Sequence, residues 1–181
     1  MTAPAEAGAA VSAAPVPIVI GLGGNVGTQS AIVERFDRAR TALAALDPAS
    51  VRSARLFRSE PIGPEQAWFL NTAVRIAPQG LEPAALIATL LELERMLGRR
   101  RETEARWGPR PLDLDVLVWG PRIVRTSELE VPHPRLAERR FALLPVIDLL
   151  GDEFVVPGLG PARELLRGVS DQRCDPVAAT W

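Results

Sequence analysis

The sequence has 181 residues, near-average hydrophobic and charged fractions, and a formal net charge of −1. These values fit one globular domain with a sizeable core, and they exclude a polycation that recruits nucleic acid or an anionic membrane through its overall charge. All 21 basic residues are arginine, which excludes a Walker-type phosphate lysine, Schiff-base chemistry and a lysine general base. The single cysteine, Cys174, excludes an intrachain disulfide framework and favours a cytoplasmic location.

The N-terminal part of the chain predicts a tail followed by a strand and a helix. Residues 1–15 are rich in alanine, with proline and glycine, and carry no basic residue, so we expect a disordered tail there and a single domain over residues 16–181. The apolar run 16–22 predicts a buried strand, and a glycine-rich turn leads from it into a helix beginning near Thr28. Val26 breaks the G-x-G-x-x-G dinucleotide fingerprint, which disfavours a Rossmann domain.

Two further strands and a second helix follow. Alternation predicts strands over residues 51–59 and 69–77, joined by a loop that carries two prolines. In the second strand Phe69 and Asn71 share a face. From periodicity alone, Phe69 is interpreted as core and Asn71 as a solvated amide. Pro83 begins a second amphipathic helix, and Gly98 ends it.

The stretch from Arg106 to Gly120 carries the most informative chemistry. Alternation places Leu112, Leu114, Val116 and Val118 on one face of a strand, and Asp113, Asp115 and Leu117 on the other. Two carboxylates on one strand face, roughly 6.5 to 7 Å apart, repel each other by about 2.5 kcal/mol at an effective dielectric near 20, and a cation between them reverses that cost. Mg²⁺ is usually held by one or two carboxylates together with substrate phosphates, so the pair predicts a metal and phosphate site. A solvated strand face is the simpler alternative.

Several arginines precede the two aspartates within a short loop, at positions 99, 100, 101, 106 and 110. Arginine forks match phosphate oxygens bidentately, so such a loop could close over a polyphosphate. A solvated charge run is the usual alternative. The direct connection of the loop to Asp113 and Asp115 favours phosphate binding.

The remaining chain predicts a short strand near residues 123–124, His133 held between two prolines, a helix to about Leu150 interrupted at Pro145, and a small helix over residues 162–167. The order βαββαβ predicts an α+β, ferredoxin-like fold, in which an antiparallel sheet carries both helices on one face and leaves the opposite face for a ligand. A C-terminal helical extension would follow this unit.

Four separated motifs resemble the 6-hydroxymethyl-7,8-dihydropterin pyrophosphokinase family over about residues 16–170. They are Gly21 to Gly27, Gly63-Pro64 followed by Phe69-Leu70-Asn71, Arg106 to Asp115, and Val131-Pro132-His133-Pro134 followed by Arg139 and Phe141. The resemblance implies transfer of the pyrophosphoryl group of ATP to the hydroxymethyl oxygen of the pterin, with release of AMP, in folate biosynthesis. It also implies a monomer with small-molecule substrates and no nucleic-acid or membrane partner.

The resemblance further implies a role for each matching residue. Asp113 and Asp115 would hold two Mg²⁺ ions that bridge the ATP phosphates, and Asp113 would also lie near the pterin. The catalytic phosphate clamp and the ATP site would contain Arg99 or Arg100, Arg110, Trp107, Glu94, Val116, His133 and Arg139. Phe69 and Phe141 would sandwich the pterin, while Asn71, Ser59 and Ile62 would read its ring edge. The loop from Arg99 to Trp107 would close over both substrates.

Two other functions fit parts of the pattern. An Mg²⁺-dependent phosphohydrolase could use the same two aspartates, and it would release hydrolysis products instead of transferring a group. A ferredoxin-like RNA-binding module is the second alternative. It lacks support because the characteristic aromatic strand motif is missing and carboxylates on the sheet face would repel an RNA backbone.

Overall fold

A computed structural model describes residues 15–102, 107–178 and 181. Arg106 and almost all of the predicted tail over residues 1–15 therefore lie outside the described residues. The elements in chain order are β1 (Ile18–Gly24), α1 (Gln29–Ala44), β2 (Arg52–Ser53), β3 (Leu56–Ser59), β4 (Phe69–Ile76), α2 (Pro83–Met96), β5 (Asp113–Trp119), β6 (Val124–Arg125), β7 (Glu130–Val131), a 3₁₀ turn (Leu136–Glu138), α3 (Arg140–Leu150), β8 (Val155–Val156), β9 (Gly160–Pro161), α4 (Ala162–Arg167) and β10 (Cys174–Ala178).

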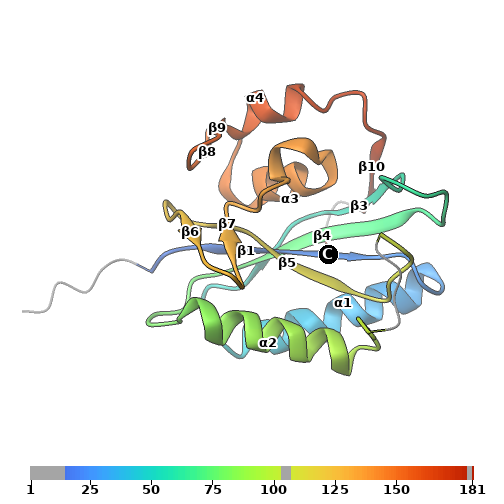
Figure 1. Ribbon diagram of the computed structural model, residues 1–181, viewed down its shortest axis with the longest axis horizontal. Coiled ribbons are helices and arrows are strands. Elements are labelled where there is room, and N and C mark those ends of the chain that lie inside the picture. The colour runs from blue at the N-terminus through green and yellow to red at the C-terminus, as the bar shows by residue number, and fades with distance from the viewer. Residues whose placement is uncertain (1–14, 103–106, 179–180) are drawn as a thin grey trace, which may run out of the picture.

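The main sheet is antiparallel and has the strand order β10-β3-β4-β1-β5, with β2 paired to β4 (Figure 1). Helix α1 connects β1 to the β2–β3 segment, and α2 connects β4 to β5. This arrangement confirms the predicted ferredoxin-like α+β fold, because the two central strands are the first and third of the four main strands. It also places the aspartates of β5 next to the glycines of β1.

Helices α1 and α2 pack against one face of the sheet, below it in Figure 1. Thr28 caps α1 by accepting the Ala31 N–H at 3.2 Å, and Pro83 opens α2 at a position that needs no N–H. The cluster under this face contains apolar residues of β1, β4 and β5 together with Phe36 and Leu90 of the helices. Leu112, Leu114 and Val116 belong to it, as the alternation predicted.

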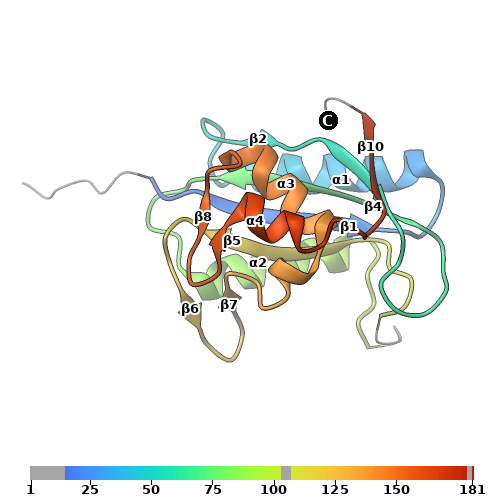
Figure 2. The same ribbon diagram turned by 90° about the horizontal axis from the view of Figure 1, so that it is seen from above.

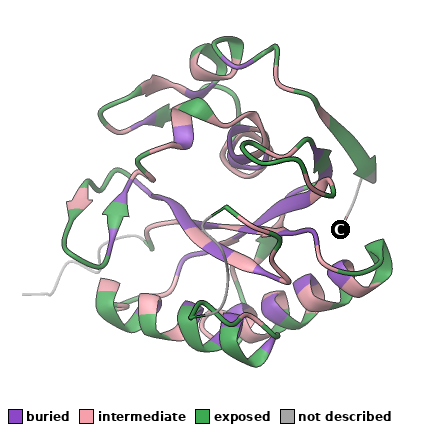
Figure 3. Ribbon diagram, turned by 45° about the vertical axis from the view of Figure 1, so that its right-hand side comes forward, coloured by how far each residue is buried: buried purple, intermediate pink, exposed green. Residues whose placement is uncertain are grey.

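The opposite sheet face is only partly open, so the prediction that this whole face is left for a ligand is wrong. Helices α3 and α4 lie over it, and α3 contacts β4 and β1 (Figure 2). A second core cluster forms there from Val19 and Leu117 of the sheet and Leu143 and Val146 of α3. Burial of both faces is visible in Figure 3. Pro145 lies within α3 without ending it, contrary to the predicted interruption.

Three local features also differ from the predictions. The expected strand over residues 51–59 is two strands, because the Arg55 N–H leaves the sheet and donates to Asp148 at 3.0 Å. β1 continues through Gly24, so most of the expected glycine turn is strand. A register shift between β1 and β5 turns Val118 to the α3 side, whereas strict alternation placed it with Leu112. Strand β10 had no counterpart in the predicted elements.

None of the described helices combines the length and the apolar character needed to cross a membrane.

Candidate active site

A cavity of about 330 Å³ opens on the part of the sheet that α3 leaves uncovered. Its walls come from the β3–β4 loop, the loop before β5, and the segment from His133 to Ala142. Twelve of the predicted site residues line it: Ser59, Ile62, Phe69, Asn71, Arg99, Trp107, Arg110, Asp113, Asp115, His133, Arg139 and Phe141. Residues far apart in the sequence therefore meet at one place.

The floor of the cavity is bare backbone in the middle and polar at both sides. Gly21 and Gly23 of β1 face the cavity, and Gly23 pairs with Asp113 of β5 on one side and Asn71 of β4 on the other. A methyl group on Gly23 would come 3.3 Å from the Asn71 amide oxygen. Glycine therefore keeps the floor flat, so one ligand can reach both the carboxylates and the amide.

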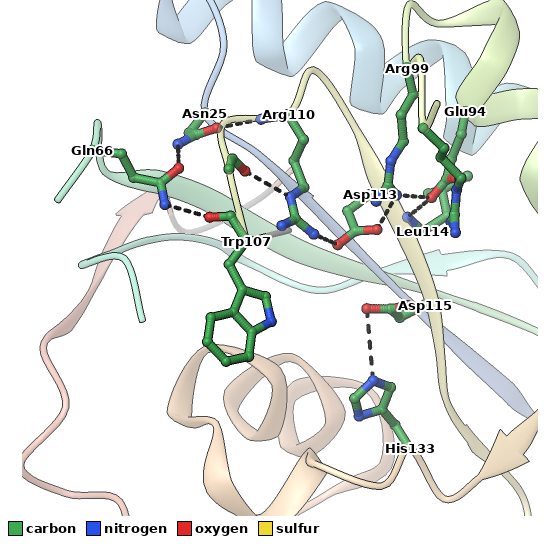
Figure 4. A network of polar contacts seen from close by, with 12 residues as sticks. Asn25, Gln66, Glu94, Arg99, Trp107, Arg110, Asp113, Leu114, Asp115 and His133 are labelled. Carbon is green, nitrogen blue, oxygen red and sulfur yellow. Dashed lines mark hydrogen bonds and ion pairs between the residues drawn. The ribbon is translucent and has the colours of Figure 1, made fainter. Parts of the chain in front are cut away.

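Asp113 lies between two arginines (Figure 4). Arg110 Nη1 donates to Asp113 Oδ2 at 2.7 Å, and Arg99 Nη1 donates to Asp113 Oδ1. Burial alone would raise the pKa of Asp113, but the charges and hydrogen bonds of these two guanidinium groups outweigh it and hold that pKa below its usual value. Asp113 is therefore ionised at neutral pH, as a metal ligand must be.

Asp115 lies two residues further along the same face, and its environment is different. Burial of the carboxyl and the nearby charge of Asp113 raise the pKa of Asp115 to about 7, and Arg139 only partly opposes this shift. The side chain remains 40% exposed towards the cavity. A carboxylate that is costly to ionise and that opens into a cavity is a place where a cation would be stabilising. The donor set of Asp113 and Asp115 therefore fits Mg²⁺ completed by phosphate and water oxygens.

Glu94 of α2 organises the arginines from behind the cavity. Its carboxylate is 1% exposed and accepts the Leu114 N–H at 2.8 Å, Arg99 Nη1 at 2.5 Å and the Arg101 Nε at 2.9 Å. Glu94 does not line the cavity, so its predicted part in the ATP site would be indirect, through the arginines that it binds. Its contacts instead fix Arg99 and Arg101 at the cavity wall.

The structure also shows which of the three consecutive arginines line the cavity, a distinction that the sequence alone did not allow. Arg99 and Arg101 line the cavity, whereas Arg100, one of the predicted catalytic residues, does not. Arg101 was missed as an individual site residue because a run of three arginines contains no signal that distinguishes its members. Val116, predicted in the ATP site, packs with its side chain in the helix-side core, so only its backbone could contact a nucleotide.

His133 is held as a neutral hydrogen-bond donor. Its Nδ1 accepts the Arg135 N–H at 3.1 Å, which leaves the proton on Nε2, and Nε2 lies 3.9 Å from Asp115 Oδ2. Burial and the nearby charge of Arg139 lower the pKa of His133 to about 4. The ring therefore presents an N–H to the cavity at neutral pH without adding a charge.

A buried asparagine joins three loops around the cavity, and it was not predicted as a site residue from the sequence. Asn25 Nδ2 donates to Gln66 Oε1 at 2.9 Å and to Ala67 O at 3.0 Å, while its Oδ1 accepts the Arg110 N–H at 2.9 Å. Gln66 Nε2 in turn donates to Trp107 O at 2.8 Å. Trp107 has a positive φ of 63°, so its carbonyl direction depends on such a contact (Figure 4).

The far end of the cavity is suited to a flat, polar ring. Phe69 of β4 and Phe141 of α3 both line the cavity. Asn71 is 4% exposed and donates from Nδ2 to Ser59 Oγ at 2.9 Å, so the interpretation of Asn71 as a solvated amide is wrong. A cavity lined by two aromatic side chains and by a fixed amide and hydroxyl is typical of a heterocycle site.

Arg135 and Arg139 complete the cavity on the side of α3. The Arg135 guanidinium lies 5.8 Å from the centre of the Trp107 ring, and Arg139 lies 5.7 Å from the centre of the Phe141 ring. Burial, followed by the charge of Arg135, lowers the pKa of Arg139. The described walls thus place five arginines, at positions 99, 101, 110, 135 and 139, around three carboxylates, those of Glu60, Asp113 and Asp115. The excess of positive charge suits a bound polyphosphate.

Comparison with known families agrees with this geometry. Residues 19–151 match the model of the 7,8-dihydro-6-hydroxymethylpterin-pyrophosphokinase family. The chain belongs to this family. As a member of the pyrophosphokinase family, it is 38% identical over 131 residues to 2-amino-4-hydroxy-6-hydroxymethyldihydropteridine pyrophosphokinase of Bacillus subtilis, covering 72% of this chain and 75% of the relative. It is 31% identical over 156 residues to the Haemophilus influenzae protein of the same name, covering 85% and 93%.

Other relatives of this pyrophosphokinase family member are longer. The chain is 38% identical over 137 residues to a folate synthesis bifunctional protein of Arabidopsis thaliana, covering 75% of this chain but 27% of the relative. It therefore spans about a quarter of that protein. A solved HPPK-DHPS structure in complex with substrates superposes with a TM-score of 0.65 at 11% identity, covering 87% of this chain and 44% of that one. At that identity the superposition supports the fold alone.

Proposed function

We propose that this protein transfers the pyrophosphoryl group of ATP to the hydroxymethyl oxygen of 6-hydroxymethyl-7,8-dihydropterin. The observation that carries the proposal is the shared floor of the cavity. The paired aspartates, set among arginines, lie at one side of Gly23, and the Asn71 amide lies at the other. A phosphate-binding half and a ring-binding half therefore meet on one strand.

The ring-binding half would hold the pterin between Phe69 and Phe141. Asn71 and Ser59 would read the edge of the ring, with Ile62 covering it, and Asp113 lies close enough to the flat floor to approach the hydroxymethyl group. Stacking and fixed polar groups orient such a ring without covalent chemistry. The hydroxymethyl oxygen would then point towards the phosphate-binding half.

The phosphate-binding half would hold ATP. Asp113 and Asp115 would carry two Mg²⁺ ions which, when bound, act as Lewis acids on the phosphate oxygens. Arg99, Arg101 and Arg110 would clamp the phosphates, His133 would donate from Nε2, and Arg139 would meet the charge at the α3 side. Arg99 and Arg110 already bind Asp113, so they would exchange the carboxylate for phosphate oxygens when both substrates are present.

The reaction follows from this placement. The hydroxymethyl oxygen attacks the β-phosphorus of ATP, the bond from that phosphorus to the bridging oxygen of the α-phosphate breaks, and AMP leaves with the electron pair. The proton of the attacking hydroxyl group passes to solvent water. Such a transfer depends on positioning and charge neutralisation, and needs no nucleophilic side chain. The arginines stabilise the charge that moves towards AMP. Residues 16–181 would form one catalytic domain that acts as a cytoplasmic monomer.

One assay separates this proposal from its rivals. The protein is incubated with ATP, Mg²⁺ and the hydroxymethyl dihydropterin, and the nucleotides are resolved by chromatography. Pterin-dependent AMP, with an equal amount of pterin diphosphate, is the expected result. ADP as the product, or nucleotide hydrolysis that does not require pterin, would overturn the proposal and support a phosphohydrolase.

A further inference from the structure

Helix α3 begins without a capping side chain of its own, although it begins at the cavity wall. Its N-cap residue, Arg139, makes no side-chain cap hydrogen bond. The amide of Gln172, 32 residues further along the chain, takes that place: Oε1 accepts the Arg140 N–H at 2.9 Å, and Nε2 donates to Glu138 O at 2.7 Å. One side chain therefore fixes the backbone on both sides of Arg139.

The backbone that Gln172 holds carries two cavity residues. Arg139 lies between its two contacts, and Phe141 follows directly after them. The Arg139 carbonyl accepts the Ala142 and Leu143 N–H groups at 3.1 Å each, so the first turn of α3 is continuous with the clamped peptide. Movement of that turn would displace both Arg139 and Phe141.

The residues next to Gln172 hold the opposite wall. Glu60 donates its N–H to Arg173 O at 3.3 Å, and Cys174 of β10 pairs with Ser59 of β3. Ser59 in turn accepts from Asn71. The segment 172–174 thus links β3 at Ser59 to the start of α3 at Phe141. This segment lies beyond the residues that match the family model. Figure 1 shows β10 running beside β3 at the level of α3.

The space between the two walls is not filled by side chains. A second cavity of about 230 Å³ lies there, bordered by Ser59, Glu60, Ile62, Phe141, Gln172 and Cys174. Close packing normally fixes an aromatic wall, and on this side of Phe141 it is missing. The hydrogen bonds of Gln172 therefore add a polar link that holds this turn on the side facing Ser59, whereas the other side of the turn packs on the second core cluster.

We propose that Gln172 is a positioning residue for ring binding: by clamping the start of α3 to the C-terminal segment, it sets the distance between Phe141 and the Ser59–Asn71 pair. The inference rests on the proposed function, since it assigns the ring between these walls to a pterin. Gln172 does not touch the ring, and acts through Arg139 and Phe141.

The test measures pterin affinity of the full chain by fluorescence titration in the presence of Mg²⁺ and a non-hydrolysable ATP analogue. Gln172→Ala should weaken pterin binding by about fivefold to tenfold, the size expected for loss of a helix cap, and should speed amide hydrogen exchange at Arg140. Ser170→Ala, an exposed change in the same turn region, should stay within about twofold of wild type. Gln172→Glu keeps the acceptor for the Arg140 N–H but loses the donor to Glu138 O, so its pterin affinity should lie between those of wild type and Gln172→Ala. This variant replaces Gln172→Ala in the test if Gln172→Ala does not fold.

A double-mutant cycle distinguishes positioning from general stabilisation. If Gln172 acts through Phe141, Gln172→Ala should have little further effect on pterin affinity in a Phe141→Ala background. Unchanged pterin affinity in Gln172→Ala, even with a lower melting temperature, would overturn the inference while leaving the proposed function intact. Additive effects in the cycle would also overturn it. A wild-type protein that binds no pterin would overturn the proposed function and this inference together.

Discussion

Arg110 Nη1 donates to Asp113 Oδ2 across 2.7 Å, whereas Asp115, on the same strand face, faces His133 Nε2 at 3.9 Å and has its pKa raised to about 7. Two neighbouring carboxylates with the same proposed function thus differ in how ionisation of each affects the stability of the folded protein. Asp113 is stabilised as an anion by its arginines. Asp115 is destabilised as an anion by burial and by Asp113.

This difference predicts opposite stability effects for two matched variants. Asp113→Asn should lower the melting temperature at pH 8, because Arg99 and Arg110 lose their anionic partner. Asp115→Asn should leave the melting temperature unchanged or raise it, because it removes a charge that repels Asp113. Both should lower turnover by about 10²-fold or more if both residues hold metal. Near-normal turnover in either variant would contradict the metal assignment.

Glu94 is predicted to stabilise the cavity wall through the hydrogen bonds that it accepts, although burial raises the pKa of its carboxyl above the usual value. Glu94→Gln removes a carboxylate that is 1% exposed and leaves Arg99 and Arg101 without it, so unfolding by urea should show a loss of about 3 kcal/mol. Glu92→Gln is the control, because Glu92 lies on the same helix, is 51% exposed and pairs with Arg95 at 2.6 Å. That exposed pair should contribute little to stability, because solvent screens it. Equal losses for the two variants would argue against a role for burial.

The three-loop network predicts separate effects on stability and on activity. Asn25→Ala removes a buried side chain, 5% exposed, that binds the Arg110 N–H and the Ala67 carbonyl, and it should cost about 1 kcal/mol of unfolding free energy. Gln66→Ala should cost little stability, but it removes the hydrogen bond from Gln66 to the Trp107 carbonyl and should lower kcat/KM for ATP by about tenfold. Gln79→Ala, an exposed loop change, serves as the control in both measurements. A kinetically normal Gln66→Ala would show that the Trp107 contact is dispensable.

The reactivity of Cys174 should depend on pH in a particular direction. Burial raises the pKa of the Cys174 thiol to about 11, and Arg140 only partly opposes this shift. The thiolate is therefore scarce in the folded protein at pH 8, and alkylation by iodoacetamide should accelerate steadily from pH 8 towards pH 11. In urea the midpoint should fall to about 8.5, the value of an ordinary cysteine. Fast labelling of the native protein at pH 7 would contradict the prediction.

The sequence by itself determined the βαββαβ order and the chemistry of β5. Alternation of Leu112, Asp113 and Leu114 is a local property of a strand, and it correctly divided the core face from the cavity face. The caps Thr28 and Pro83 are also local, and both helices begin where these residues predict. The motif spacing was sufficient to identify the family.

Only the tertiary structure decided how these parts act on one another. The pairing of β1 with both β4 and β5 brings Asn71 and Asp113 to the two sides of Gly23, and no local pattern specifies which strands are neighbours. The two charges of Asp113 and Asp115 look equivalent in the sequence. Their environments differ because Asp113 accepts hydrogen bonds from Arg99, which Glu94 of α2 also holds, and from Arg110, whereas Asp115 faces His133. The role of Gln172 is likewise not visible in a local sequence pattern, because the residues that it binds lie 32 and 34 positions away in the chain.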